Sequence, residues 1–144
     1  MLKALRRLAA FCLCITLSLG LITPAAAKAD DAAVIERQAA AFEETKSRLP
    51  ELARLVSNED WTFTRNLIHG PMQEVGREML YINQRLDKPE RKEAEAIARD
   101  LKAALANLDE AARLQDSSRL QRSYSAVAAG FEAYSEVIPD EALS

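Results

Sequence analysis

Cysteine is scarce in this 144-residue chain, and both cysteines, Cys12 and Cys14, lie near the N-terminus. The rest of the chain therefore has no disulfide framework, no thiol nucleophile and no thiolate metal site. The four glycines and five prolines are too few for a collagen-like or loop-rich disordered chain. Alanine and leucine dominate while β-branched residues are sparse, a composition typical of a helical protein.

Positive charge is in deficit beyond the N-terminal segment. The chain has 19 lysines and arginines against 22 aspartates and glutamates. Without Lys3, Arg6 and Arg7, 16 basic residues remain against the same 22 acidic ones, a net charge of −6. A domain of this sign does not bind nucleic acid through phosphate neutralisation. The length predicts one domain that is large enough to bury a core.

The N-terminus is typical of an exported protein. A basic segment (residues 1–7) precedes an uncharged apolar run (residues 8–22), and Ala25-Ala26-Ala27 follows. These are the successive regions of a signal peptide, and the run is too short for a comfortable membrane span. We expect cleavage after Ala27, with Ala29 as a second position, so that residues 28–144 form the mature domain. The alternative is an N-terminal anchor that stays attached.

Apolar residues recur along the mature chain at alternating spacings of three and four, which predicts helices packed nearly parallel to one another. The four predicted helical segments are 31–56, 59–86, 89–114 and 118–137. Pro50 predicts a break near residues 47–49. The apolar register continues across Gly70-Pro71, which predicts one kinked helix there. Short connections make neighbouring helices antiparallel, so the predicted fold is an all-α, up-down-up-down four-helix bundle.

The apolar stripes define the predicted core. They consist of Ile35, Ala39, Phe42, Leu49, Ala53 and Val56 in the first segment, Ile68, Met72, Val75, Met79, Ile82 and Leu86 in the second, Ala94, Ile97, Leu101, Ala104 or Leu105, Leu108 and Ala111 in the third, and Leu120, Tyr124, Val127, Phe131, Tyr134 and Ile138 in the fourth. Lys46 interrupts the first stripe. Ser57 and Asp87 are predicted helix caps, and Asp116-Ser117-Ser118 is predicted to supply a connection and a third cap, because these residues offer side-chain oxygens at a helix start.

Catalytic and metal-binding groups are few. His69 is the single histidine, and the positions three and four residues away hold Arg65, Asn66, Met72 and Gln73. His69 therefore has no second zinc ligand one helical turn away. Paired carboxylates such as Asp109-Glu110 match no calcium-loop pattern. Their presence is explained if they lie on helix faces that are exposed to solvent. We expect no catalytic residue, no metal ligand and no directly bound cofactor, since neither calcium nor zinc has a local motif here.

The least generic stretch is residues 61–71. Trp61, Arg65 and Ile68 fall on roughly one helix face, and tryptophan and arginine are the residue types that dominate interface energetics. One interpretation is a partner-binding site made of Trp61, Arg65, His69, Gly70 and Pro71. The other is that Trp61 closes one end of the bundle while Arg65 pairs with a nearby acid.

These residues carry a resemblance to the PsbQ family of extrinsic photosystem II subunits, most closely its cyanobacterial form. The resemblance spans residues 35–139 and rests on Asp60-Trp61, Arg65-Asn66, Ile68 to Pro71, Leu49 to Leu52, Leu101-Lys102, Leu108-Asp109, Ala111, and Tyr124, Phe131 and Tyr134. It implies a non-catalytic four-helix bundle on the lumenal face of photosystem II. The implied partners are the core-antenna chlorophyll protein and the manganese-stabilising protein. The implied role is to stabilise the complex and to retain calcium and chloride at the water-oxidising cluster.

The chain departs from the cyanobacterial members of the family that it resembles, which are typically lipoproteins with a cysteine at the processing site. Phe11 precedes Cys12 and Leu13 precedes Cys14, whereas a lipoprotein signal needs a small residue there. We therefore expect a protein that is peripheral to the thylakoid membrane through protein contacts alone, in the thylakoid lumen, and a monomer when free. The zinc linked to some relatives is not carried over, because His69 has no local partner ligand.

Two other functions compete with this interpretation. One is a PsbQ-like subunit of the NADH dehydrogenase-like complex, although the short leader of bacterial type disfavours an imported plant protein. The other is a secreted all-helical enzyme without a cofactor, such as a chorismate mutase. That chemistry needs several cations inside the bundle, whereas the arginines here lie mostly off the apolar stripes.

Overall fold

The computed structural model describes residues 24–143, and residues 1–23 of the expected signal peptide lie outside the described residues. The chain divides into two units, Met1–Asp30 and Asp31–Ser144, and only the second is considered below. The helices are α2 (Pro24–Lys46), α3 (Leu49–Ser57), α4 (Trp61–His69), α5 (Val75–Asn83), α6 (Lys88–Leu114), α7 (Ser117–Ser135) and a short 3₁₀ helix, η1 (Asp140–Ala142). The described part of the chain contains no strand, so the all-α prediction is confirmed there.

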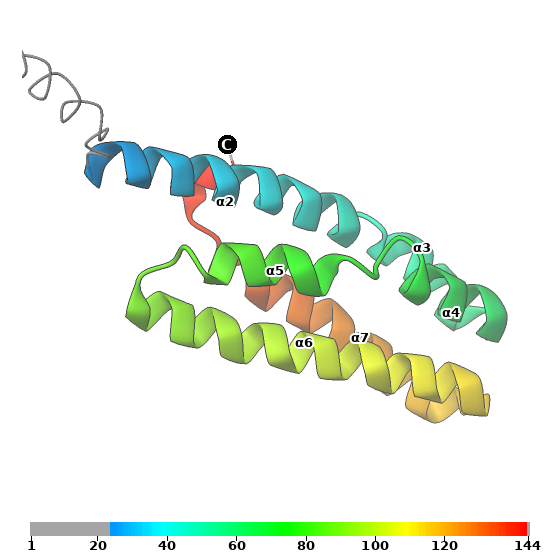
Figure 1. The fold of residues 1–144 in the computed structure, drawn as a ribbon. Helices are drawn as coiled ribbons and strands as arrows, with labels where there is room; N and C mark the ends of the chain where they lie inside the picture. Colours follow the sequence, from blue (N-terminus) through cyan, green and yellow to red (C-terminus); the bar gives the residue numbers. More distant parts are fainter. Residues whose placement is uncertain (1–23, 144) are drawn as a thin grey trace, which may run out of the picture. The chain divides into compact units, whose positions relative to one another are not determined.

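Helix α6 is the centre of the packing. It makes its most extensive contact with α7 and also packs against α4 and α5, while α3 packs against α4 and α7 (Figure 1). Only Gln115 and Asp116 join α6 to α7, which forces the two helices to run antiparallel. Gln115 makes the reversal with a left-handed backbone (φ 55°), and the Asp116 carboxylate caps α7 by accepting from the Arg119 N–H at 2.9 Å. The cap predicted within Asp116-Ser117-Ser118 is confirmed, and it is Asp116.

The predicted break before Pro50 is confirmed, but it changes the register of the core that follows it. Helix α2 ends at Lys46 and α3 begins at Leu49. Leu52 and Leu55 are buried, whereas Leu49 and Ala53, the predicted core positions, are only partly buried. Val56, the last position of this predicted stripe, is fully buried, and Leu49 packs against the edge of the core. The turn at Ser47-Arg48 thus shifts the buried face of α3 toward Leu52 and Leu55, and the prediction is only partly correct at Leu49 and Ala53.

The predicted start of the second segment was also wrong. Ser57 is the last residue of α3 and does not cap α4. Glu59 adopts a left-handed conformation (φ 53°), which redirects the chain, and Asp60 caps α4 by accepting from the Phe63 N–H at 3.3 Å. Asp87 does occupy the N-cap position of α6, but its side chain makes no capping hydrogen bond.

The predicted single kinked helix across Gly70-Pro71 is two helices with a turn between them. Pro71 has no N–H to donate to the Leu67 carbonyl, and the Met72 N–H takes that place at 3.1 Å. Gly70 has φ −105° and ψ −103°, and a Cβ there would lie 2.8 Å from the backbone oxygen of Asn66. The turn therefore needs glycine at this position. The apolar register nevertheless survives, since Ile68, Met72 and Val75 are all buried.

The rest of the predicted core is confirmed apart from two half-buried positions. Ile97 and Tyr124 are only partly buried, while Ala98 and Ser123 beside them are buried. Both Ala104 and Leu105 are buried, so α6 uses both alternatives. At the centre of the core, the fully buried Phe42 of α2 packs against the rings of Phe131 and Tyr134 of α7.

Two polar side chains, Tyr134 in the core and Lys46 at its edge, link α7 to other helices. The Tyr134 hydroxyl lies 2.7 Å from Asn83 Oδ1 and 3.0 Å from the Met79 carbonyl oxygen, which joins α7 to α5. Burial raises the pKa of this phenol. Lys46, which interrupts the first stripe, donates to Glu132 and to Ser135 Oγ, each at 2.9 Å. The cation at a core-facing position thus links α2 to α7.

None of the helices in the described part of the chain combines the length and the apolar character that a membrane crossing requires.

Candidate functional site

The residues singled out in the sequence lie along one face of α4. Trp61, Arg65 and His69 follow one another at intervals of four, so each stands about one helical turn from the next. The Asp60 cap fixes the start of this helix, and the Gly70 turn fixes its end. Because α4 packs against α6, this face meets the C-terminal half of α6.

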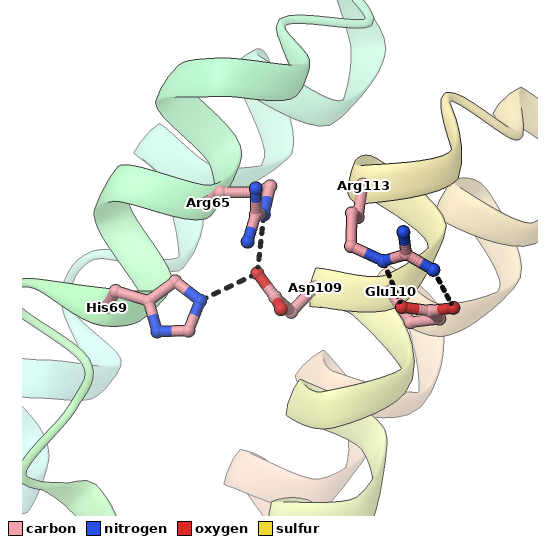
Figure 2. A network of polar contacts seen from close by, with 5 residues as sticks. All are labelled: Arg65, His69, Asp109, Glu110 and Arg113. Carbon is pink, nitrogen blue, oxygen red and sulfur yellow. Dashed lines mark hydrogen bonds and ion pairs between the residues drawn. The ribbon is translucent and has the colours of Figure 1, made fainter.

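Two of these side chains meet at one carboxylate oxygen of α6. Arg65 Nε donates to Asp109 Oδ1 at 3.0 Å, and His69 Nε2 lies 2.8 Å from the same oxygen (Figure 2). The Asp109 side chain is 22% exposed, that of Arg65 41% and that of His69 60%. An ion pair this open to solvent contributes about 0–1 kcal/mol to folding. In the structure, this shared contact orients the arginine and histidine side chains toward Asp109.

A second ion pair lies next to the first on α6. Arg113 holds Glu110 with two hydrogen bonds of 2.7 Å each, from Nε and Nη2 (Figure 2). The hydrogen bond from Arg113 lowers the pKa of Glu110, and the carboxylate in turn raises the pKa of Arg113. Asp109 and Glu110 are thus both paired with cations, and the α4/α6 face presents arginine and histidine edges beside them.

Between these groups is a shallow hollow of about 270 Å³. It is lined by Trp61, Thr62, Arg65, Asn66, His69, Ala112, Arg113 and Gln115. Trp61 is partly buried and packs on the hydrophobic core while it also lines this hollow. The structure thus combines features of both sequence interpretations, since Arg65 has its acidic partner and Trp61 contacts the core, yet both side chains remain accessible.

Gly70 and Pro71 are not part of this hollow. Both are exposed in the turn after α4, and Pro71 lines a different hollow, between α3 and α4. Their structural effect on the α4/α6 face is indirect, because they set where α4 ends. The five predicted site residues therefore divide into three on the face and two in the turn that bounds it.

Sequence reasoning did not place Asp109, Glu110 or Arg113 at this site. Asp109 lies 44 positions after Arg65 along the chain, although the two side chains are hydrogen-bonded. The only local signal is that Asp109 and Arg113 are one turn apart on α6. No pattern within a single helix shows which helix packs against α4, so the pairing could not be found from the sequence alone.

The described residues gather no cluster of three or more histidine, cysteine, aspartate or glutamate side chains able to hold a metal ion. At the α4/α6 face, His69 and Asp109 form only a pair, and two arginines lie beside them. Arginine and tryptophan side chains beside paired carboxylates suit hydrogen bonding and packing against a protein surface better than they suit metal coordination.

Comparison with known proteins decides the family. Residues 6–139 match the family model PsbQ, described as oxygen evolving enhancer protein 3. The chain belongs to the PsbQ family. It is also similar to CyanoQ of Synechocystis sp., with 27% identity over 88 residues, which cover 61% of this chain and 59% of that protein. The alignment therefore spans less than two thirds of CyanoQ.

The family match covers every element of the α4/α6 face, from Trp61 to Arg113. The arrangement at Asp109 is thus a feature of a PsbQ-family chain, and the resemblance noted on the residues around Trp61 is confirmed at the level of the family.

Proposed function

We propose that this PsbQ-family chain is a non-catalytic extrinsic subunit of photosystem II. Its role is to stabilise the oxygen-evolving complex on the lumenal side and to help retain calcium and chloride at the water-oxidising cluster. The observation that carries this proposal is the family match over residues 6–139. The similarity to CyanoQ supports it.

The proposed architecture of the mature domain, residues 28–144, is an up-down-up-down four-helix bundle. In this arrangement, α2 and α3 together form the first helical segment of the bundle, and α4 and α5 form the second. Helices α6 and α7 are the third and fourth segments. The contacts of α6 with α4, α5 and α7, and of α3 with α4 and α7, support it. In such a bundle, the side chains of the α4/α6 face would already be oriented before a partner binds.

The proposed location is the thylakoid lumen, reached with a signal peptide over residues 1–27 that is then removed. Without a lipid anchor, the domain is held at the membrane by protein contacts, as a monomer that docks on the core-antenna chlorophyll protein and the manganese-stabilising protein. The basic, apolar and small-residue order of the leader supports export.

The proposed docking site is the α4/α6 face, with Trp61, Arg65 and His69 as the contact residues. Gly70 and Pro71 bound the helix that carries them. An indole ring supplies a large contact area, and a guanidinium group whose Nε is already held by Asp109 loses little freedom when its other N–H groups bind a partner.

Co-purification tests the proposal. A tagged copy of the chain is expressed in the source cells, and oxygen-evolving photosystem II is isolated under low salt. We expect the mature protein in that preparation at near-stoichiometric amounts. Its removal should reduce oxygen evolution most strongly when calcium and chloride are limiting, and re-addition should restore it. Recovery with an NADH dehydrogenase-like complex, and not with photosystem II, would contradict the proposal.

A further inference from the structure

A second hollow lies on the other side of α4, against α3. It measures about 460 Å³ and is lined by Glu51, Arg54, Leu55, Asp60, Phe63, Asn66, Leu67 and Pro71. Leu55 and Leu67 are buried, at 4% and 6% exposure, and form an apolar floor. The Phe63 side chain is 60% exposed, more than any other large hydrophobic residue in the described part of the chain.

The charged side chains around this hollow differ in the ion pairs and hydrogen bonds that they make. Glu51 has Arg48 as a neighbour, with Oε2 3.9 Å from Nη1. The Asp60 carboxylate accepts the N–H of Phe63 at 3.3 Å. Arg54 is exposed, and its side chain has no ion pair or hydrogen bond with any residue that the structure describes. Among the described residues that line the hollow, Arg54 is therefore the charged group with neither an ion pair nor a hydrogen bond, while Asp60 has a hydrogen bond but no ion pair.

We propose that this α3/α4 hollow binds a protein partner through an apolar side chain next to a carboxylate. The apolar side chain, best supplied by an aromatic residue, would pack on the Phe63 ring over Leu55 and Leu67. The carboxylate would accept hydrogen bonds from the Arg54 guanidinium. Aromatic residues and arginine are the types that interfaces enrich, and a cation left without an internal partner specifies the charge of the group that it meets.

The α3/α4 hollow is continuous with the α4/α6 face. Asn66 lines both hollows, so α4 is the ridge between them. The proposed partner would extend from Trp61 and Arg65 on one side of this ridge to Phe63 on the other. The inference rests on the proposed function in this respect, because it takes the partner to be the photosystem II surface that covers the α4/α6 face.

The test is rebinding to photosystem II particles from which this chain has been removed by salt. The variants are Phe63→Ala and Arg54→Gln. Each has a matched control on another helix: Leu80→Ala, whose side chain is 50% exposed on α5, and Arg37→Gln, an exposed arginine of α2. Circular dichroism and thermal melting of every variant check that folding is unchanged, as expected for exposed positions.

We expect Phe63→Ala and Arg54→Gln each to weaken rebinding about tenfold, the size of effect typical of interface anchors, while both controls bind like the wild type. As salt is raised within the range in which the wild-type chain still binds, the effect of Arg54→Gln should shrink, whereas that of Phe63→Ala should not. Wild-type affinity in both hollow variants would overturn the inference. An equal loss in Phe63→Ala and Leu80→Ala would also overturn it, because it would indicate unspecific apolar adhesion.

The two proposals fail in different ways. If the wild-type chain does not rebind at all, the proposed function is wrong and the inference falls with it. If the wild type rebinds and Arg65→Ala weakens it while Phe63→Ala and Arg54→Gln do not, only the α3/α4 hollow is excluded.

Discussion

The rings of Phe42 and Phe131 pack together in the core, with centroids 5.4 Å apart and planes inclined at 38°. Tyr134 adds a third ring, with its centroid 4.9 Å from that of Phe42. All three side chains are fully buried, and the cluster joins α2 to α7. Much of the packing between these two helices therefore depends on aromatic rings.

Replacement of Phe131 tests this packing. We expect Phe131→Ala to lower the free energy of unfolding by about 3–5 kcal/mol, because it removes a buried ring and leaves a cavity. Urea unfolding followed by far-UV circular dichroism measures the change. The matched control is Phe63→Ala, since this ring is 60% exposed, and its effect should stay within about 0.5 kcal/mol. A loss below about 1 kcal/mol for Phe131→Ala would contradict the packing described.

Glu78 should make stability depend on pH. Its side chain is buried on α5, Thr45 Oγ1 of α2 donates to it at 3.3 Å, and burial raises the pKa of the carboxyl group. The Thr45 hydrogen bond and the Arg77 charge oppose this rise in pKa, and Glu74 adds to it. Since the folded-state pKa is the higher one, the stabilisation by this group is complete below the unfolded value of 4.5 and is lost as pH rises through the folded value.

Glu78→Gln removes the titration and shows the sign of the effect. At pH 7 we expect the variant to unfold at a higher urea concentration than the wild type, and below about pH 4 the difference should vanish. The control Glu36→Gln, at an exposed position of α2, should follow the wild-type pH profile. A Glu78→Gln variant that is less stable than the wild type at pH 7 would show that the ionised carboxylate stabilises the fold.

Gly70 should be irreplaceable in the turn between α4 and α5. An added Cβ would lie 2.8 Å from the Asn66 backbone oxygen, which cannot move without distorting α4. We expect Gly70→Ala to cost about 1–3 kcal/mol of unfolding free energy. Gly76→Ala is the matched control, because its Cβ would meet only the Lys102 side chain at 3.6 Å. Gly76→Ala should be neutral or stabilising by up to about 1 kcal/mol. Equal effects of the two substitutions would contradict the close approach at Gly70.

Salt should release the protein from the membrane if no lipid anchors it. Exposed charges are screened over about 10 Å at 0.1 M salt and over shorter distances at higher concentration. We expect washing of thylakoids with about 1 M salt to elute the mature chain. Retention through the wash, with mass spectrometry showing an acylated N-terminal cysteine, would overturn our interpretation of the leader and of Cys12 and Cys14.

The sequence predicted those parts of the fold that depend on local spacing. The stripes of α5, α6 and α7 are buried largely as the alternation of three and four requires, and the helix break falls before Pro50 as expected. Two errors lie just after the chain changes direction, whereas the partly buried Ile97 and Tyr124 lie inside α6 and α7. Leu52 and Leu55 replace Leu49 and Ala53 in the core, and Asp60 replaces Ser57 as the cap of α4. The turn before α3 shifts the helical phase by an amount that spacing along the chain does not show, whereas the turn at Gly70-Pro71 preserves the apolar register.

The candidate site was predictable only in part for a related reason. Trp61, Arg65 and His69 share a face because of their spacing on one helix. Asp109 meets Arg65 and His69 because α4 packs on α6, which is a tertiary contact. The hollow beside Phe63 likewise depends on how α3 and α4 pack, and neither helix alone indicates it.

The most direct test of the account is rebinding of the Arg65→Ala variant to salt-washed photosystem II. Arg65 is 41% exposed and its ion pair with Asp109 contributes little to folding, so helicity and thermal stability should be almost unchanged. We predict that the variant loses about 2 kcal/mol or more of binding free energy. Arg37→Gln controls for the loss of one exposed cation. Normal rebinding with a normal spectrum would contradict docking through the α4/α6 face, and loss of helicity together with binding would show that Arg65 serves only the fold.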